Sequence, residues 1–253
     1  MDARALEDTI RQKSSQPNHE SDCHNNWTIL LTVNNAYFDF FQNWHLAYSK
    51  LNINYPIIIV AEDVLVYEKL KPFQSESVTI EKSGHEDVKK SAAYGSKEFS
   101  KLVSQRPTHI LRHLTKGVNI LYSDIDMVWL KNPFPYFKGD FDMWIELDSI
   151  NNYCTGLMAI KSNKNCLRLI KTWQNSLQLK QEIDQTAFNK VVNKAPINIS
   201  ILDNRIFPTG QQYFGTLTDK QRALAIVVHN NWIVGQTAKL ERFKKYKLWF
   251  VPV

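Results

Sequence analysis

The stretch VNILYSDIDMVWLKNPFPYF, residues 118–137, holds a nearly apolar run that ends at two aspartates and then meets a turn rich in proline. A run of this kind is typical of a strand covered on both faces, as in a largely parallel sheet. WTILLTV at 27–33 and PIIIVAED at 56–63 have the same character. Segments of helical period separate the runs, so we predict an α/β fold with a mixed, mainly parallel central sheet and helices on both faces.

Further strands are predicted at FDMWIEL (141–147), TGLMAIK (155–161) and ALAIVVHN (223–230). Two helices are predicted from apolar residues at helical spacing, Tyr37, Phe41, Trp44 and Tyr48 in the first and Cys166, Ile170, Trp173 and Leu177 in the second, after a cap at Ser162. Two more are expected at SKEFSKLVSQ (96–105) and PTHILRHLTKG (107–117), the second ending at a glycine.

Composition indicates a folded protein. The chain has 253 residues, of which 43% are hydrophobic and 22% charged, and a net charge of +6. Its basic residues are spread along the chain and form no stripe with exposed aromatics, which disfavours a nucleic-acid partner. No run approaches the ~18 apolar residues of a membrane span. Residues 1–26 are polar and are predicted to be a leader or stem, with one domain at 27–253.

Two aspartates, Asp124 and Asp126, follow the buried run one residue apart. In an extended segment residues i and i+2 point the same way, so their carboxylates can converge on one point. Convergent carboxylates suit Mg²⁺ or Mn²⁺ together with substrate phosphates. The alternatives are a capped, solvated turn, or the nucleophile motif of a phosphatase. The second is disfavoured because such motifs normally lie on the first strand of their fold.

Ligands of open α/β sheets bind beyond the carboxyl ends of the strands. That rule directs attention to polar residues that follow the apolar runs: Asn34, Asp63, Asp124, Asp126 and His229. Asn34 and Asp63 could equally be helix caps. Taken alone, His229 is more often a hydrogen-bonded core residue than a metal ligand.

Five ordered motifs carry a resemblance to a known family: ILYSDIDMVWLKNPFPYF, YCTGLMAIKSN, DQTAFN, LDNRIFPTGQQYF and VVHNNWIVGQTAKLERF. In this order and spacing they resemble the nucleotide-diphospho-sugar transferases of glycosyltransferase family 77, over about residues 27–250. The resemblance implies a GT-A-type (Rossmann-like) fold, a UDP-sugar donor, a divalent metal, Mn²⁺ or Mg²⁺, and transfer with retention of anomeric configuration. The expected acceptor is a hydroxyl of a glycan or glycoprotein, and the expected sugar a pentose or galactose.

The resemblance also implies residue roles. Asp124, Asp126 and His229 become the metal ligands, and Lys239 neutralises the departing diphosphate. Asn34, Asp63 and Arg106 stand where the nucleotide binds. Asp148, Thr155, Gly156 and Gln185 line the donor-sugar pocket, whereas Asp184 is expected to cap its helix. Double displacement would need a carboxylate beneath the anomeric carbon, for which Asp148 or Glu146 is the candidate, while front-face attack would need none.

Localisation and turnover leave alternatives open. The triplets at Asn26 and Asn198 fit the N-glycosylation pattern, which favours the Golgi lumen over the cytoplasm. The non-enzymatic alternative is a nucleotide-sugar- or carbohydrate-binding protein of the same fold without turnover.

Overall fold

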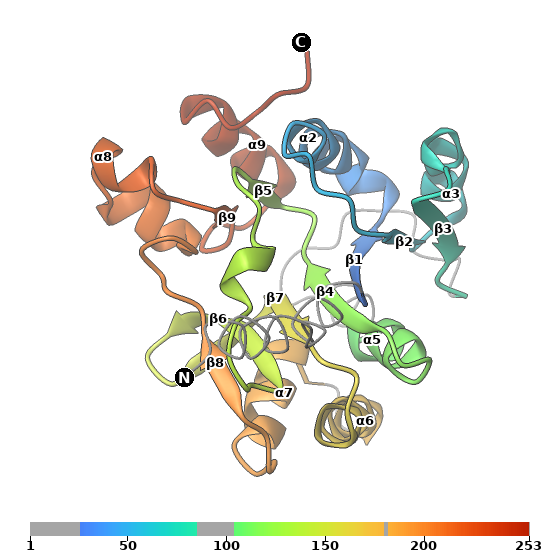
Figure 1. Ribbon diagram of the computed structural model, residues 1–253. Coiled ribbons are helices and arrows are strands. Elements are labelled where there is room, and N and C mark those ends of the chain that lie inside the picture. Colours follow the sequence, from blue (N-terminus) through green and yellow to red (C-terminus); the bar gives the residue numbers. More distant parts are fainter. Residues whose placement is uncertain (1–25, 85–103, 180–181, 253) are drawn as a thin grey trace, which may run out of the picture.

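Seven strands form the central sheet of the computed structural model, which describes residues 26–84, 104–179 and 182–252. The leader expected at 1–26 lies outside these residues except for Asn26, as does most of the helix expected at 96–105. In chain order the strands of the sheet are β1 (Trp27–Val33), β2 (Ile57–Ala61), β3 (Val78–Lys82), β4 (Asn119–Ser123), β6 (Met143–Ser149), β7 (Asn152–Ile160) and β8 (Ile199–Ile201). Their spatial order is β3-β2-β1-β4-β7-β6-β8 (Figure 1).

The sheet is mainly parallel, as predicted. β1 pairs in parallel with β2 on one side and with β4 on the other, β3 continues the parallel set, and β8 lies parallel to β6. Only β7 runs antiparallel to its neighbours, β4 and β6, among the strands of this sheet. A separate two-stranded sheet joins β5 (Met127–Trp129) to β9 (Val227–His229), with Met127 opposite His229.

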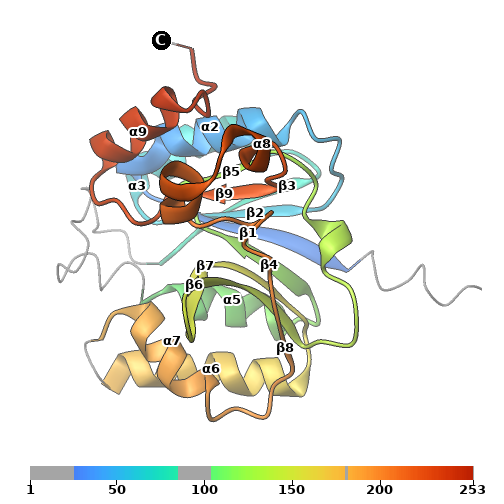
Figure 2. The same ribbon diagram turned by 90° about the vertical axis from the view of Figure 1, so that its left-hand side faces the viewer.

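Helices cover both faces of the central sheet (Figure 2). On one side lie α2 (Phe38–Tyr48), α3 (Val64–Leu70), α8 (Asp219–Arg222) and α9 (Gln236–Lys245), and on the other α5 (Arg106–Leu114), α6 (Lys164–Leu179) and α7 (Asp184–Val192). Short turns of helix occur at η2 (Asn35–Tyr37), η3 (Lys71–Phe73), η4 (Phe134–Tyr136) and η5 (Gln212–Thr216). No helix among the described residues is both long and apolar enough to cross a membrane.

Strand alternation divides the core in two. Ile29 and Leu31 of β1 face the cluster under α2 and α9, whereas Leu30 between them faces the cluster under α5 and α6. All three side chains are fully buried. A strand buried on both faces has no polar side to present, which explains why its sequence lacks alternation.

Some local expectations were wrong. The cap of α6 is Asn163, whose Oδ1 accepts from the Cys166 amide at 2.9 Å, because the Ser162 hydroxyl donates instead to the Leu114 carbonyl at 2.6 Å. The run at 223–230 forms a strand only over 227–229, and this strand belongs to the small sheet. The short strands β3, β5 and β8 were not predicted.

Candidate functional site

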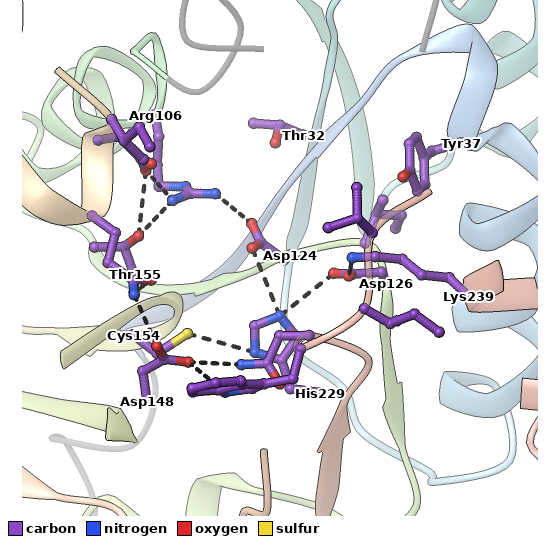
Figure 3. A pocket seen from close by; sticks show the side chains of 18 of the residues that line it. Thr32, Tyr37, Arg106, Asp124, Asp126, Asp148, Cys154, Thr155, His229 and Lys239 are labelled. Atoms are coloured by element: carbon purple, nitrogen blue, oxygen red, sulfur yellow. Dashed lines mark hydrogen bonds and ion pairs between the residues drawn. The ribbon is translucent and has the colours of Figure 1, made fainter. Parts of the chain in front are cut away.

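The two aspartates lie in a turn between β4 and β5, at the carboxyl edge of the parallel strands (Figure 3). The Asp124 amide donates to the Gly156 carbonyl at 2.7 Å, which holds the turn against β7. Ile125 between the acids is 8% exposed and packs into the core. The carboxylates converge as predicted, although a turn rather than an extended segment brings them together.

His229 completes a three-residue cluster with the acids. The pairing of β9 with β5 sets its Nε2 3.6 Å from Asp126 Oδ1 and 4.0 Å from Asp124 Oδ2. The ligand atoms of the three side chains all lie within 4.8 Å of one another. The structure therefore brings together, at one point, the three residues for which the sequence predicted metal binding.

Glu146 of β6 lies behind the histidine. His229 Nδ1 donates to Glu146 Oε2 at 2.9 Å, and the Cys154 sulfur lies 3.6 Å from the same nitrogen. Because Nδ1 is hydrogen-bonded to Glu146, Nε2 is the imidazole nitrogen that faces Asp124 and Asp126. Glu146 is 1% exposed and does not line the cavity described below, so it is not placed to attack a sugar there.

Gly156 of β7 leaves room for this cluster. A Cβ built on it would lie 2.6 Å from His229 Cε1 and 2.8 Å from Asp124 Oδ2. Its neighbour Met127 would be 3.1 Å away. No larger residue fits here without displacing a side chain of the cluster, so the glycine is explained by close approach.

The donor set fits a divalent cation. Two carboxylate oxygens and one imidazole nitrogen, with an open side towards a cavity, suit Mn²⁺ or Mg²⁺. A second cluster of Glu146, Cys154 and His229 shares the histidine but is wholly buried. Burial raises the pKa of the Cys154 thiol to about 12, which disfavours the thiolate form that binds metals. The residues that could hold a metal are Asp124, Asp126 and His229.

Lys239 of α9 forms an ion pair with Asp126. Burial alone would raise the pKa of the Asp126 carboxyl, but Lys239 and His229 hold this pKa well below its ordinary value. Burial would lower the pKa of Lys239, but Asp126 outweighs it and raises that pKa. Both groups are therefore charged, and the ammonium lies beside the cluster of acids and histidine.

Arg106, the first residue of α5, is buried and bridges two acids. Its Nη2 donates to Asp124 Oδ1 at 2.8 Å, and its Nη1 donates to the Thr155 hydroxyl at 2.6 Å and to Asp184. Its guanidinium also lies over the Tyr122 ring. Burial would lower the pKa of Arg106, but the two acids raise it. The arginine thus fixes Asp124 from behind, a contact that the sequence did not reveal.

Asp184 does not cap its helix. The structure makes it the first residue of α7, after Ile183, and its carboxylate binds Arg106 and the Thr155 hydroxyl. Burial raises the pKa of this carboxyl despite the neighbouring guanidinium. The expected cap is therefore wrong, because the side chain points into the site.

A cavity of about 710 Å³ opens over the cluster, within the usual size of ligand pockets. It is lined by residues from β1, the acid-bearing turn, β6, β7, α7, the loop after β9 and α9: Thr32, Asn34, Tyr37, Glu62, Arg106, Asp124, Ile125, Asp126, Asp148, Cys154, Thr155, Ile183, Asp184, Gln185, His229, Asn231, Trp232, Ile233, Val234 and Lys239. Nine of the eleven predicted site residues line it, and Gly156 lies directly beneath the cluster.

Asp148 holds one end of the cavity. Its Oδ1 accepts from Asn231 Nδ2 and from Trp232 Nε1, each at 3.1 Å. Its Oδ2 accepts from Gln185 Nε2 at 3.3 Å, and Gln185 Oε1 accepts from the Thr155 amide at 3.4 Å. The predicted sugar-pocket residues are therefore connected to one another by hydrogen bonds.

Asn34 and Asp63 act as helix caps. Asn34 Oδ1 accepts from the Tyr37 amide at 3.1 Å, and Asp63 accepts from the Val66 amide at 2.9 Å and from the Asn35 amide at 2.6 Å. Asn34 still lines the cavity, but Asp63 does not. The structure does not bring Asp63 to the site, because both of its oxygens are used by backbone amides.

Several lining residues were missed. Tyr37 was assigned to the core, yet it belongs to η2 and reaches the cavity. Asn231 and Trp232 stand within the HNNW motif beside the predicted histidine, and that adjacency was the available signal. Glu62 follows β2 directly and could have been found by the same strand-end rule that selected Asp63.

Solved glycosyltransferases share this fold. GlyE of Streptococcus pneumoniae TIGR4 superposes with a TM-score of 0.52 at 13% identity, covering 87% of this chain and 64% of GlyE. A glycosyltransferase involved in glycosylation of the major capsid of PBCV-1 gives a TM-score of 0.53 at 12% identity, with 87% and 98% covered. The fold is that of GT-A glycosyltransferases.

The sequence narrows the class to one family. Residues 53–243 match the family of nucleotide-diphospho-sugar transferases, and the chain belongs to it. UDP-D-xylose:L-fucose alpha-1,3-D-xylosyltransferase 3 of Arabidopsis thaliana is 29% identical, with 90% of this chain and 67% of that protein covered. The UDP-galactose:fucoside alpha-3-galactosyltransferase of Dictyostelium discoideum is 28% identical, with 63% and 29% covered. This membership confirms the predicted enzyme class and disfavours the phosphatase alternative.

Proposed function

We propose that this chain moves a sugar from a UDP-sugar to a hydroxyl of a glycan or glycoprotein, with a divalent metal and with retention. The observation that carries the proposal is the convergence of Asp124, Asp126 and His229 beside Lys239, at the edge of a cavity of about 710 Å³. Two similar proteins are named for UDP-xylose and UDP-galactose, which supports a UDP-sugar as the donor. Those same names make xylose and galactose the first sugars to test.

The metal, Mn²⁺ or Mg²⁺, would supply a Lewis acid for the donor diphosphate. Lys239 would place a second positive charge against the phosphate as the bond to the sugar breaks. Arg106 would keep Asp124 in position rather than contact the nucleotide, since both of its terminal nitrogens already have partners. Asn34 and Tyr37 would lie against the nucleoside, because they form the end of the cavity next to β1.

In the proposed reaction the bond between the anomeric carbon and the β-phosphate oxygen breaks, and its electron pair leaves with UDP. In front-face attack the acceptor oxygen would form the new bond on the same face, and its proton would pass to the departing phosphate; in double displacement a carboxylate would first take the place of UDP on the anomeric carbon, and the acceptor oxygen would then displace that carboxylate. Of the two carboxylates first considered as nucleophiles, Asp148 alone lines the cavity, while Glu146 lies behind His229. Asp148, Thr155, Gly156 and Gln185 would shape the sugar end of the site.

Donor hydrolysis gives the direct test. The protein is incubated with UDP-xylose, UDP-galactose and other UDP- and GDP-sugars, with Mn²⁺ or with a chelator, and released nucleotide is measured. We expect metal-dependent release from one UDP-sugar and none from the isosteric variant Asp126→Asn. Absence of both nucleotide binding and release from the wild type would contradict the proposal. Binding without release would instead support the alternative of a protein without turnover.

Acceptor transfer needs a second assay. Both named relatives act on fucose or a fucoside, so methyl α-L-fucoside is the first acceptor probe. NMR of the product reports the anomeric configuration, and an inverted linkage would contradict retention. The expected activity is pentosyl or galactosyl transfer.

For localisation we propose the Golgi lumen, with the cytoplasm as the alternative. The proposal depends on the sequons at Asn26 and Asn198, yet Asn26 Nδ2 donates to the Gly117 carbonyl at 2.7 Å and Asn198 Nδ2 to the Asp140 carbonyl at 2.6 Å. Each bond uses one of the two Nδ2 hydrogens, and both side chains are exposed, so a glycan can be attached to either asparagine. A mass shift on treatment with an endoglycosidase would support a lumenal enzyme, and unmodified asparagines would favour the cytoplasm.

A further inference from the structure

A second cavity, of about 600 Å³, adjoins the first one. Trp232 and Ile233 line both cavities, so the two spaces meet along the loop that follows β9. The second cavity is otherwise formed by η5 and α9, with Gln211, Gly215, Glu241 and Lys245 among its residues. An acceptor must present its hydroxyl at the anomeric carbon of the donor, so its binding site has to border the donor cavity.

Trp232 stands at this border in an unusual conformation. Its φ is +58°, which is a rare value for a bulky residue, and its side chain is 52% exposed. Residues held in strained backbone conformations are concentrated at functional sites, where the surrounding contacts maintain them. The core gains little from an indole in this position, so burial does not explain it.

The loop that carries Trp232 is held from two sides. On the donor side, the indole Nε1 and the Asn231 amide both donate to Asp148. On the other side, Asn231 Oδ1 accepts from the Gly210 amide at 2.6 Å, and the Asn231 carbonyl accepts from Arg242 at 2.5 Å. The indole is thereby fixed rather than free, as a binding platform must be.

We propose that the second cavity is the acceptor subsite of the transferase, with a saccharide ring stacked on Trp232. An indole offers an apolar face to the C–H groups of a sugar, and its polar edge here is already satisfied by Asp148. Gln211, Glu241 and Lys245 are exposed around the cavity and supply donors and acceptors for sugar hydroxyls. This inference depends on the proposed function and names the part of the site that binds its acceptor.

The test compares transfer with hydrolysis in the same enzyme. With the active UDP-sugar, Mn²⁺ and methyl α-L-fucoside as the probe, the ratio of transferred sugar to free sugar is measured. Trp232→Ala should lower this ratio at least tenfold, and Gly215→Leu should do the same by filling the cavity, since a Cβ there meets nothing within 4 Å. Trp232→Phe keeps a ring but cannot donate to Asp148, and should retain most of the ratio.

Leu224→Ala is the matched control, because Leu224 is 55% exposed and lines neither cavity. Its ratio should equal that of the wild type. An unchanged ratio in both Trp232→Ala and Gly215→Leu would overturn the subsite while leaving the transferase intact. A Trp232→Phe variant as impaired as Trp232→Ala would also overturn it, because Trp232 would then act only by holding Asp148. A wild type that releases no nucleotide from any donor would overturn the proposed function, and this inference with it.

Discussion

Substitution of Gly156 by alanine tests the geometry of the proposed metal site. The added Cβ would lie 2.6 Å from His229 Cε1, whereas ordinary contacts begin at 3.4 Å. One of the two groups must therefore move by about 0.8 Å, several times the ~0.2 Å within which metal–ligand distances are normally held. The other near contact, 2.8 Å to Asp124 Oδ2, concerns a second proposed ligand.

The displacement has two possible outcomes, and both can be measured. If the imidazole and the carboxylate move, the ligand set opens and Mn²⁺ affinity falls, by at least the ~10- to 100-fold that weaker perturbations of metal sites cause. If β7 moves instead, overpacking lowers the free energy of unfolding by about 1–3 kcal/mol. The third contact, 3.1 Å to Met127 Cε, involves the end of a flexible side chain, so the contacts with His229 and Asp124 decide the outcome.

Electron paramagnetic resonance of free Mn²⁺ gives the affinity, and urea unfolding of the chelated protein gives the stability. Gly215→Ala is the matched control, since its Cβ would meet nothing within 4 Å. We expect the control to match the wild type in both measurements. A Gly156→Ala variant that binds Mn²⁺ within twofold of the wild type and is also as stable as the wild type would refute the assignment of Asp124 and His229 as ligands.

Three further perturbations probe residues around the site and the core. Glu146→Gln replaces the acceptor behind His229 by a neutral one, and should weaken Mn²⁺ binding ~10- to 100-fold in the same titration without changing the donor specificity. Arg106→Met leaves the Asp184 carboxylate buried without its cation, and should lower the urea-derived free energy of unfolding by about 3–5 kcal/mol, much of which the added Asp184→Asn change should restore. Burial raises the pKa of the Cys166 thiol to about 12, so the unfolded chain loses this proton above pH ~8.5 while the native protein keeps it. The stability that this thiol contributes is thus complete below pH ~8.5 and declines by ~1.4 kcal/mol per pH unit above it. In urea titrations between pH ~8.5 and ~10.5, the free energy of unfolding of Cys166→Ala should therefore decline less steeply than that of the wild type. Equal slopes for the two proteins would contradict this prediction.

The central strands could be predicted because their burial leaves a simple pattern. β1 is predicted with its observed bounds, Trp27–Val33, since almost every residue of it is enclosed by helices on both faces. The edge strands β3 and β8 lack such a signal, because their residues are only partly buried and mixed in polarity. These two segments form strands because neighbouring strands pair with them, and their own sequences do not predict it.

The residues of the site could be named from ordered motifs, but their partners could not. Arg106 and Asp184 are 78 positions apart, and the packing of α5 and α7 against α6 brings them together. Asp184 looks like a cap in the sequence because it begins a helix, and only the position of Arg106 reveals a buried ion pair. Glu146 is likewise 83 positions from His229, and the two residues lie on strands of different sheets, β6 and β9, so tertiary packing rather than sequence spacing explains their contact.

The two acids divide their oxygens in the same way, which ties the ion pairs to the proposed chemistry. Asp124 directs Oδ1 to Arg106 and Tyr122, while its Oδ2 faces His229. Asp126 directs Oδ2 to Lys239, while its Oδ1 faces the same histidine. Each carboxylate is therefore oriented by a cation on one oxygen and presents the other to a common point.

Arg106 and Lys239 nevertheless differ in whether they could leave their carboxylate partner to contact a donor diphosphate. Arg106 also lines the cavity, but it is bound to the buried Asp184 as well as to Asp124, so it can stay paired with Asp124 when a donor binds. Lys239 lines the cavity and has Asp126 as its carboxylate partner, so it can turn to a diphosphate once a metal shares the charge of that acid. If a metal binds there, charge neutralisation at Asp126 and the release of Lys239 would be one event, and metal binding would be coupled to donor binding.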